Sequence, residues 1–172
     1  MNPVLSSWNV AEAQPALDAM LACCGARRWA AAMVALRPIA GVQELSTAAD
    51  RIWRTMEEAD WMEAFACHPR IGKRSPQRTA PASQRSDAWS GQEQSAASSA
   101  TERVSAELAA GNALYEQRFG FTYIVCATGR SAEEMLAILN RRLAGDRASE
   151  LIEAAEQQRQ ITQIRLGKWL VE

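Results

Sequence analysis

The chain has 172 residues, of which 48% are hydrophobic and 23% are charged. This length and composition suit one compact domain with a substantial core, so we expect a single domain over residues 1–172. The 19 basic and 20 acidic side chains leave a net charge of −1. That balance gives no electrostatic reason to expect a nucleic acid as partner.

Membrane and metal-binding classes are also disfavoured. The longest apolar stretch, residues 29–36, is far shorter than the roughly 20 residues of a membrane-spanning helix, and the N-terminus lacks a basic segment followed by an apolar signal core. We therefore expect a soluble cytoplasmic protein without a membrane partner. The four cysteines form no C-x-x-C pair, and only one histidine is present to complete a zinc site. Buried reduced thiols are the predicted state.

Most of the chain is predicted to be helical, because alanine is abundant, glycine is sparse and apolar residues recur at helical spacing. In chain order, the predicted helices run from about residue 11 to Gly25, over residues 29–36, from about residue 46 past Met56, from Asp60 to His68, from Ser90 past Leu108, over residues 114–120, from Ser131 to Gly145, and from Asp146 towards the C-terminus. Gly111 is expected to interrupt or end the helix that starts at Ser90.

Three residue pairs have the spacing of a capping box, in which each side chain accepts a hydrogen bond from the other residue's backbone N–H. These pairs are Asp60 with Glu63, Ser90 with Glu93, and Ser131 with Glu134. Paired arginines such as Arg141 and Arg142 near a helix C-terminus usually complement the helix dipole, so we interpret them as structural.

Between the helices, residues 72–89 are rich in Lys, Arg, Ser, Pro and Gln and predict a long solvated loop. Residues 121–126 are predicted to be extended, but one such segment makes no sheet. The last helix carries an apolar stripe that is expected to dock on the earlier helices: Leu151, Ala155, Thr162, Leu166 and Trp169. The predicted fold is an all-α, compact multi-helix bundle with one long polar loop.

No Walker loop, dinucleotide fingerprint, zincin or serine-hydrolase motif is present. The feature that stands out is His68-Pro69-Arg70-Ile71-Gly72, which contains the single histidine. Because Pro69 favours an extended backbone at His68, the imidazole is expected to project from the helix end. An imidazole titrates near neutrality and suits proton transfer without a cofactor. A purely structural role at the helix terminus remains an alternative.

Two further segments carry polar groups that suit a binding site. Ser90 to Gln94 is interpreted first as a capping box, but a helix start also attracts anions, and Glu93 and Gln94 add an acceptor and an amide there. Arg165 is flanked by apolar residues, so its guanidinium is expected beside the core with a carboxylate as partner. A salt bridge to another helix is the structural alternative.

Taken together and in order, these pieces resemble the ureidoimidazoline decarboxylase family. The resemblance spans nearly the whole chain and rests on Trp29, Arg37-Pro38, His68 to Gly72, Ser90 with Glu93-Gln94, Tyr115, Phe119-Gly120-Phe121, and Ile161 to Leu166. It implies an all-α homodimeric carboxy-lyase that converts 2-oxo-4-hydroxy-4-carboxy-5-ureidoimidazoline (OHCU) to (S)-allantoin in urate breakdown, without a metal or other cofactor. The polar segment between Gly72 and Ser90 makes the placement of Ser90 less secure than that of His68.

Carried over position by position, the resemblance implies two catalytic residues, His68 as the acid/base and Glu93 as its polar partner. It also implies a set of substrate-binding residues: Pro69, Ser90, Gln94, Ile124, Val125, Cys126 and Arg165. Two other function classes stay open. One is a non-catalytic helical interaction module that docks through Trp29, Trp53, Trp61 and Trp89, and the other is a metal-dependent ureide hydrolase.

Overall fold

The structure is a computed structural model that describes residues 2–72 and 81–172. Within those residues all regular secondary structure is helical, which confirms the predicted all-α class. The helices are α1 (Pro3–Val10), α2 (Ala13–Cys23), α3 (Arg27–Ala35), α4 (Val42–Trp53), α5 (Glu58–Ala66), α6 (Pro81–Glu93), α7 (Ser95–Ser98), α8 (Glu102–Phe119), α9 (Ala132–Leu143) and α10 (Arg147–Trp169).

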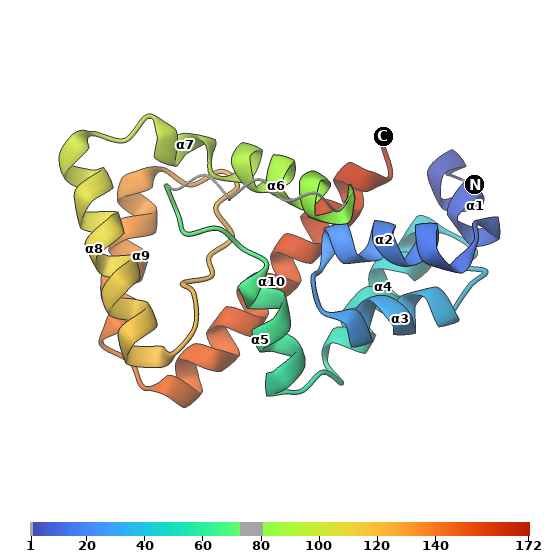
Figure 1. Ribbon diagram of the computed structural model, residues 1–172, viewed down its shortest axis with the longest axis horizontal. Helices are drawn as coiled ribbons and strands as arrows, with labels where there is room; N and C mark the ends of the chain where they lie inside the picture. Colours follow the sequence, from blue (N-terminus) through green and yellow to red (C-terminus); the bar gives the residue numbers. More distant parts are fainter. Residues whose placement is uncertain (1, 73–80) are drawn as a thin grey trace.

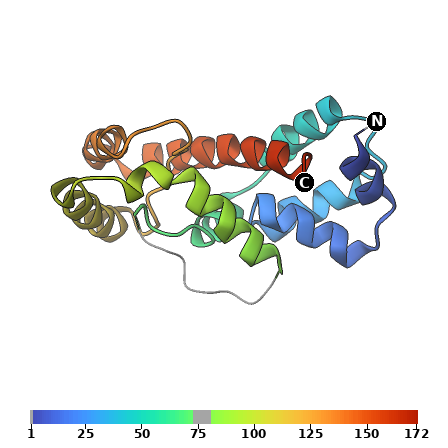
Figure 2. The same ribbon diagram turned by 90° about the horizontal axis from the view of Figure 1, so that it is seen from above.

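The long helix α10 organises the bundle. It runs through the middle of the molecule in both views (Figures 1 and 2) and contacts α2, α4, α5 and α8. At one end of the molecule α8 packs along α9, and at the other α1 to α4 gather, with α6 lying on α2 (Figure 1). Side chains on α10 therefore reach residues from both halves of the chain. None of the helices described here is both long and apolar enough to cross a membrane.

The apolar stripe predicted on the last helix is confirmed, since all five of its residues are buried: Leu151, Ala155, Thr162, Leu166 and Trp169. The same helix also buries polar side chains, among them Gln157, Gln158 and Arg165. A buried polar group costs free energy unless it is hydrogen-bonded. The partners of these groups, given below, identify the region where α10 contributes more than packing.

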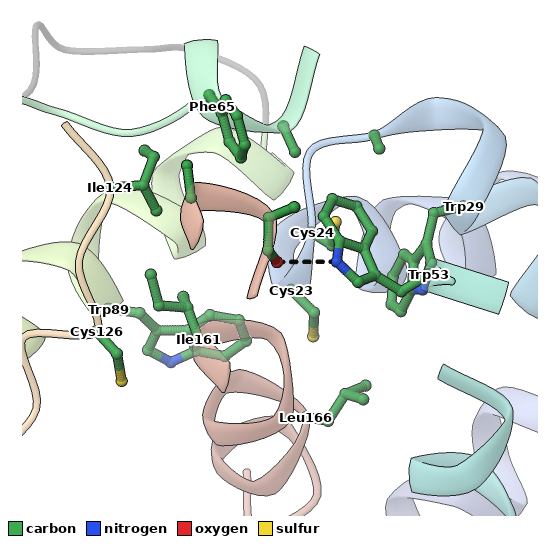
Figure 3. Packing of buried hydrophobic residues seen from close by; sticks show 14 of the residues in the cluster. Cys23, Cys24, Trp29, Trp53, Phe65, Trp89, Ile124, Cys126, Ile161 and Leu166 are labelled. Carbon is green, nitrogen blue, oxygen red and sulfur yellow. Dashed lines mark hydrogen bonds between the residues drawn. The ribbon is translucent and has the colours of Figure 1, made fainter. Parts of the chain in front are cut away.

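Buried tryptophans fill much of the hydrophobic core, part of which is seen in Figure 3. The indole N–H of Trp29 donates to the carbonyl of Ala49 at 3.1 Å, and that of Trp53 to the carbonyl of Ala155 at 2.9 Å. Trp89 is also buried, whereas Trp61 is half-buried. Three of the four tryptophans suggested as a docking surface therefore belong to the core.

Of the three predicted capping boxes, only Ser131 with Glu134 begins a helix. The Ser131 hydroxyl accepts from the backbone N–H of Glu134 at 3.1 Å, and the Glu134 carboxylate accepts from that of Ser131 at 2.7 Å. The prediction at Asp60 is wrong by one turn. Asp60 accepts from the backbone N–H of Glu57, so it is the third helical residue of α5 rather than its cap.

The sequence interpretation missed several helix starts, among them that of α8 at Glu102, which lies inside the helix predicted to run from Ser90 past Leu108. Helix α1 begins at Pro3, and the Asn2 side chain accepts from the backbone N–H of Leu5 at 3.1 Å. This start was missed although Asn at the cap and Pro at the first helical position are both typical of helix starts. Helix α4 begins at Val42, four residues before the predicted position. Its N-cap is Gly41, which has no side chain to accept a hydrogen bond from the first turn, so no side-chain capping pattern marks this start in the sequence.

The segment predicted as a polar loop contains a helix, α6, and this part of the prediction is wrong for residues 81–89. The predicted positions 73–80 lie outside the described residues. Helix α6 buries Ser86, Trp89 and Ser90, which share one face. Because two of these three are serines, the face shows no apolar periodicity in the sequence. Because α6 ends at Glu93, Ser90 and Glu93 lie at the C-terminal end of a helix and not at a helix start, so the capping box predicted there is wrong.

Gly111 does not interrupt its helix, contrary to the prediction. Helix α8 runs through it to Phe119, and Gly120 then ends the helix with a positive φ of 82°, as expected. A Cβ atom at Gly111 would lie 2.6 Å from Cδ2 of Leu139 on α9. The glycine therefore allows close packing of α8 on α9.

The four cysteines are free thiols, and Cys23, Cys24 and Cys126 are buried, while Cys67 is half-buried. Burial raises the pKa of Cys24 to about 12 and that of Cys23 well above its ordinary value. Both thiols pack in the core region drawn in Figure 3. They stay protonated in the folded state at a pH where an exposed thiol ionises.

We therefore expect the free energy of unfolding to fall above about pH 8.5, where the thiols of the unfolded chain ionise. Because the thiol pKa values are raised in the folded state, the stability that the protonated thiols contribute is fully present below the pKa of the unfolded chain and is lost as the pH rises above it. Each thiol should lower the free energy of unfolding by about 1.4 kcal/mol for each pH unit above the pKa that it has in the unfolded chain. Urea unfolding between about pH 7 and pH 10 measures the slope. The double variant Cys23→Ala, Cys24→Ala should give a shallower slope, and an equal slope would contradict the assignment.

Candidate active site

His68 lies directly after the C-terminal end of α5. Its backbone N–H donates to the carbonyl of Phe65 at 3.1 Å, and Pro69 prevents the helix from continuing. The half-buried imidazole leaves the helix end as predicted from the sequence. Its Nε2 atom lies 2.6 Å from Oε1 of Gln158, a fully buried residue of α10.

The turn that carries His68 is held to two other helices. Arg70 makes an ion pair with Glu116 of α8 through two of its nitrogen atoms. The backbone N–H of Gly72, which has a φ of 80°, donates to the Gln94 side chain at 3.3 Å. The His68 to Gly72 turn is therefore attached to α8 and to the end of α6, which restricts the position of the imidazole.

Glu93 lies at the centre of a buried polar cluster at the end of α6. Arg165 of α10 donates to both of its carboxylate oxygens, from Nε at 3.1 Å and from Nη2 at 3.0 Å. Arg165 also donates to the hydroxyls of Ser86 at 3.0 Å and Ser90 at 2.8 Å. Lys168 adds a contact to Glu93 at 3.3 Å. The side chains of Glu93 and Arg165 are only 7% and 3% exposed, so this is a buried salt bridge.

Residues 121–126, predicted to be extended, form an irregular segment without strand pairing. Side chains hold its backbone in place. Arg142 donates to the carbonyl of Ile124 at 2.7 Å, and the backbone N–H of Cys126 donates to the Gln157 side chain at 2.9 Å. The Tyr123 hydroxyl donates to the carbonyl of Met135 at 3.1 Å. A segment without a β-ladder thus has its polar groups satisfied by α9 and α10.

The sequence suggested that Arg142 complements a helix dipole, but the side chain belongs to a buried hydrogen-bond network. It forms a salt bridge with Glu150 at 2.8 Å, and the Tyr115 hydroxyl also donates to Glu150 at 2.8 Å. Burial raises the pKa of Tyr115 and of Tyr123 above the ordinary value. Both phenols are therefore protonated near neutrality. The role of Arg142 is structural, as predicted, but its effect is to position the backbone at Ile124.

These elements meet at a small pocket that contains about 290 Å³ of space between atoms, part of it open to solvent. His68 and Glu93 both border it, although they come from different ends of the fold. The residues that line it are His68, Pro69, Ile71, Glu93, Gln94, Tyr123, Ile124, Val125, Ala127 and Ile161. The Glu93 and His68 side chains thus border a pocket whose other walls are mostly apolar, and both Glu93 oxygens are hydrogen-bonded to Arg165.

Six of the nine residues suggested by the sequence lie on this pocket: His68, Pro69, Glu93, Gln94, Ile124 and Val125. Ser90 and Arg165 do not line the pocket: Arg165 donates to Glu93 and to the Ser90 hydroxyl. Cys126 lies in the wall segment with its backbone N–H bonded to Gln157. The sequence interpretation missed Gln158 because a buried glutamine on a long polar helix has no distinguishing local pattern.

Metal-ligating side chains are not clustered in the described part of the chain. No group of three or more His, Cys, Asp or Glu side chains in residues 2–72 and 81–172 is arranged to hold a metal ion. The polar side chains that line the pocket are those of His68, Glu93, Gln94 and Tyr123, and the Tyr123 hydroxyl donates to the Met135 carbonyl. They can exchange protons and bind a polar ligand.

The chain is similar in sequence to known proteins. A 37% identity over 153 residues links the chain to the uric acid degradation bifunctional protein TTL of Arabidopsis thaliana, covering 88% of this chain and 46% of that protein. The chain thus spans about half the length of that relative. A 2-oxo-4-hydroxy-4-carboxy-5-ureidoimidazoline decarboxylase of Amia calva is 30% identical over 138 residues, covering 80% of this chain and 77% of that protein.

Solved structures have the same fold. A crystal structure of OHCU decarboxylase in the presence of (S)-allantoin matches with a TM-score of 0.74 and 32% identity, covering 90% of this chain and 99% of that one. A crystal structure of (S)-allantoin synthase matches with a TM-score of 0.68 and 16% identity over 96% of this chain and 53% of that one, which shows the fold alone. The OHCU decarboxylase family model matches residues 9–167, and this chain belongs to that family.

Proposed function

We propose that this chain decarboxylates OHCU and releases (S)-allantoin, with His68 as the acid/base. The observation that carries the proposal is that His68 and Glu93 border one pocket. That pocket lies in a chain of the OHCU decarboxylase family, and a solved relative with 32% identity was crystallised in the presence of (S)-allantoin.

The substrate's own structure explains how a pocket with these few groups can act. Its carboxylate is attached to a carbon next to a ring imine. As CO2 leaves, the electron pair of the broken C–C bond forms a C=C bond to the imine carbon, and the electrons of the C=N bond move to the ring nitrogen, which takes up a proton. The hydroxyl on the same carbon then loses its proton to form the ring carbonyl, and the neighbouring carbon gains a proton. The protein has to orient the carboxylate, move the hydroxyl proton and expose one face to protonation.

The pocket geometry supports a division of roles. We assign proton transfer at the hydroxyl or carboxylate end to His68, and polar contact with the substrate to Glu93 and Gln94. Pro69 and the segment from Ile124 shape the wall. Arg165 and Ser90, first suggested as direct substrate ligands, act in this proposal by holding Glu93, because Arg165 donates to both Glu93 oxygens and the Ser90 hydroxyl accepts from Arg165.

The test is an assay on OHCU generated in the cuvette by oxidation and hydrolysis of urate. The purified chain should accelerate loss of the intermediate's absorbance and produce the circular-dichroism signal of (S)-allantoin. Folded protein that leaves the decay at the rate in buffer would favour the interaction module. Activity that disappears with a chelator would favour the metal-dependent hydrolase.

Assembly is part of the same proposal. We propose that the chain forms a homodimer, as the family resemblance implies, and that it acts in the cytoplasm. Light scattering of the purified protein measures its mass in solution. A mass equal to that of one 18.9 kDa chain at micromolar concentration would contradict the dimer.

A further inference from the structure

Gln158 connects the central helix to the imidazole of His68. It comes from α10, 90 residues further along the chain, and its side chain is completely buried. Its Oε1 atom lies 2.6 Å from His68 Nε2, which is a short hydrogen bond. Ile161, one turn further along α10, borders the pocket itself. Gln158 thus supports His68 from the side of the core.

The orientation of the Gln158 amide follows from its second partner, Thr162. The Thr162 hydroxyl donates its hydrogen to the backbone carbonyl of Gln158 at 2.9 Å. That hydroxyl can therefore only accept in its contact with the Gln158 side chain, which is 3.2 Å away. The amide NH2 consequently faces Thr162, and the amide oxygen faces His68.

An amide oxygen accepts hydrogen bonds and cannot donate them, so Nε2 of His68 must carry the hydrogen. Which nitrogen of a neutral histidine is protonated is decided by the hydrogen bond that the ring makes. We propose that Gln158 is a positioning residue that holds His68 as the Nε2–H tautomer, so that Nδ1 is the nitrogen that exchanges a proton with the substrate. The tautomer follows from the structure alone, and its use in catalysis rests on the proposed function.

A glutamine in this place differs chemically from a carboxylate. A carboxylate beside the ring would stabilise the imidazolium, whereas an amide fixes the tautomer without adding charge. The charged group that borders the pocket with His68 is Glu93, and it is already bound by Arg165 and Lys168. Each of the two groups therefore has its own support from α10, and the partner that α10 gives the imidazole is uncharged.

The single histidine makes the test direct, because protein labelled with 15N-histidine gives the imidazole signals of His68 only. At a pH where the ring is neutral, the wild-type chain should show a pyrrole-like Nε2 and a pyridine-like Nδ1. Gln158→Leu should lose this single tautomer and give a mixture. The matched control is Gln160→Leu, the same substitution two residues along α10 at a side chain bonded to Glu156, which should leave the spectrum unchanged.

Gln158→Glu is the second variant and keeps an acceptor in place. It should retain the Nε2–H tautomer, while its carboxylate should make the imidazole titrate about 1 to 3 pH units higher than in the wild type. In the decarboxylation assay, Gln158→Leu should lower kcat by about 10- to 100-fold with little change in KM, the loss typical when a partner that orients a histidine is removed. A purely structural role would instead lower thermal stability and leave the tautomer intact.

The outcomes separate this inference from the proposed function. A wild-type ring with hydrogen on Nδ1, or the same single tautomer in Gln158→Leu, would overturn the role of Gln158 whatever the activity. An inactive wild-type chain with the predicted tautomer would instead refute the decarboxylase and leave the structural part of the inference standing. If Gln158→Leu fails to fold, the wild-type spectrum and Gln158→Glu still decide the matter.

Discussion

Replacing His68 by asparagine should lower kcat for OHCU decarboxylation by about 100- to 10,000-fold, the usual contribution of a positioned acid/base group. The residue is half-buried and lies just after the end of helix α5, so the backbone should tolerate the change. Circular dichroism of the product and absorbance of the intermediate measure the rate. Turnover near that of the wild type would remove His68 from catalysis.

A second variant makes the test more specific. His68→Gln places an amide near the position of Nε2, so it can still donate towards Gln158, but it cannot exchange a proton near neutrality. We expect it to be as inactive as His68→Asn while unfolding at a temperature close to that of the wild type. The pH dependence of kcat that the imidazole causes should disappear in both variants. A persisting titration near neutrality would assign it to another group.

The salt bridge between Glu93 and Arg165 should give the largest effect on stability. Arg165→Ala removes the bidentate partner of a carboxylate that is only 7% exposed, and it leaves the hydroxyls of Ser86 and Ser90 without their donor. Breaking one partner of a buried ion pair costs about 3 to 5 kcal/mol. Urea unfolding measures this change. We expect activity to fall as well, because Glu93 loses its fixed position on the pocket.

The double variant Glu93→Leu, Arg165→Met separates stability from function. Replacing both members of a buried pair by apolar residues often restores stability, so this variant should fold as well as the wild type or nearly so. It should nevertheless be inactive. Recovery of activity together with stability would show that the pair is structural only, and the assignment of Glu93 to the site would be wrong.

A pair of the same length with an exposed arginine provides a control. Arg28 and Asp60 also approach to 3.0 Å, and their side chains are 55% and 13% exposed. Exposed pairs contribute about 0 to 1 kcal/mol. Arg28→Met should therefore change the free energy of unfolding by less than about 1 kcal/mol and leave activity unchanged. A loss as large as that of Arg165→Ala would mean that burial does not explain the difference.

The three capping-box patterns show how far local sequence can be interpreted. Ser131 with Glu134 begins a helix as predicted, because both side chains bond to backbone groups of their own turn. Ser90 with Glu93 has the same spacing but lies at the end of a helix. Its side chains bind Arg165, 72 residues away from Glu93, and no local pattern can indicate such a partner.

The family resemblance identified from ordered motifs is confirmed by the family model, and the all-α class by the helices of the described residues. The roles of the individual site residues remain predictions for the assays above. The sequence interpretation placed His68 at a helix break because proline acts on its immediate neighbour. It missed Gln158 because the role of that residue depends on a hydrogen bond to His68, which lies 90 residues earlier in the chain.

Interactions within a few residues can be interpreted from the sequence, and they account for the helical class, the helix end at Gly120, the caps at Ser131 and Asp146, and the position of His68 just after a helix. Contacts between distant segments account for the rest: the polar buried face of α6, the pairing of Glu93 with Arg165, and the hydrogen bond of Gln158 to the imidazole. The physical reason is that a buried polar side chain is stabilised by whichever partner the fold brings to it, and such partners lie far apart in the chain.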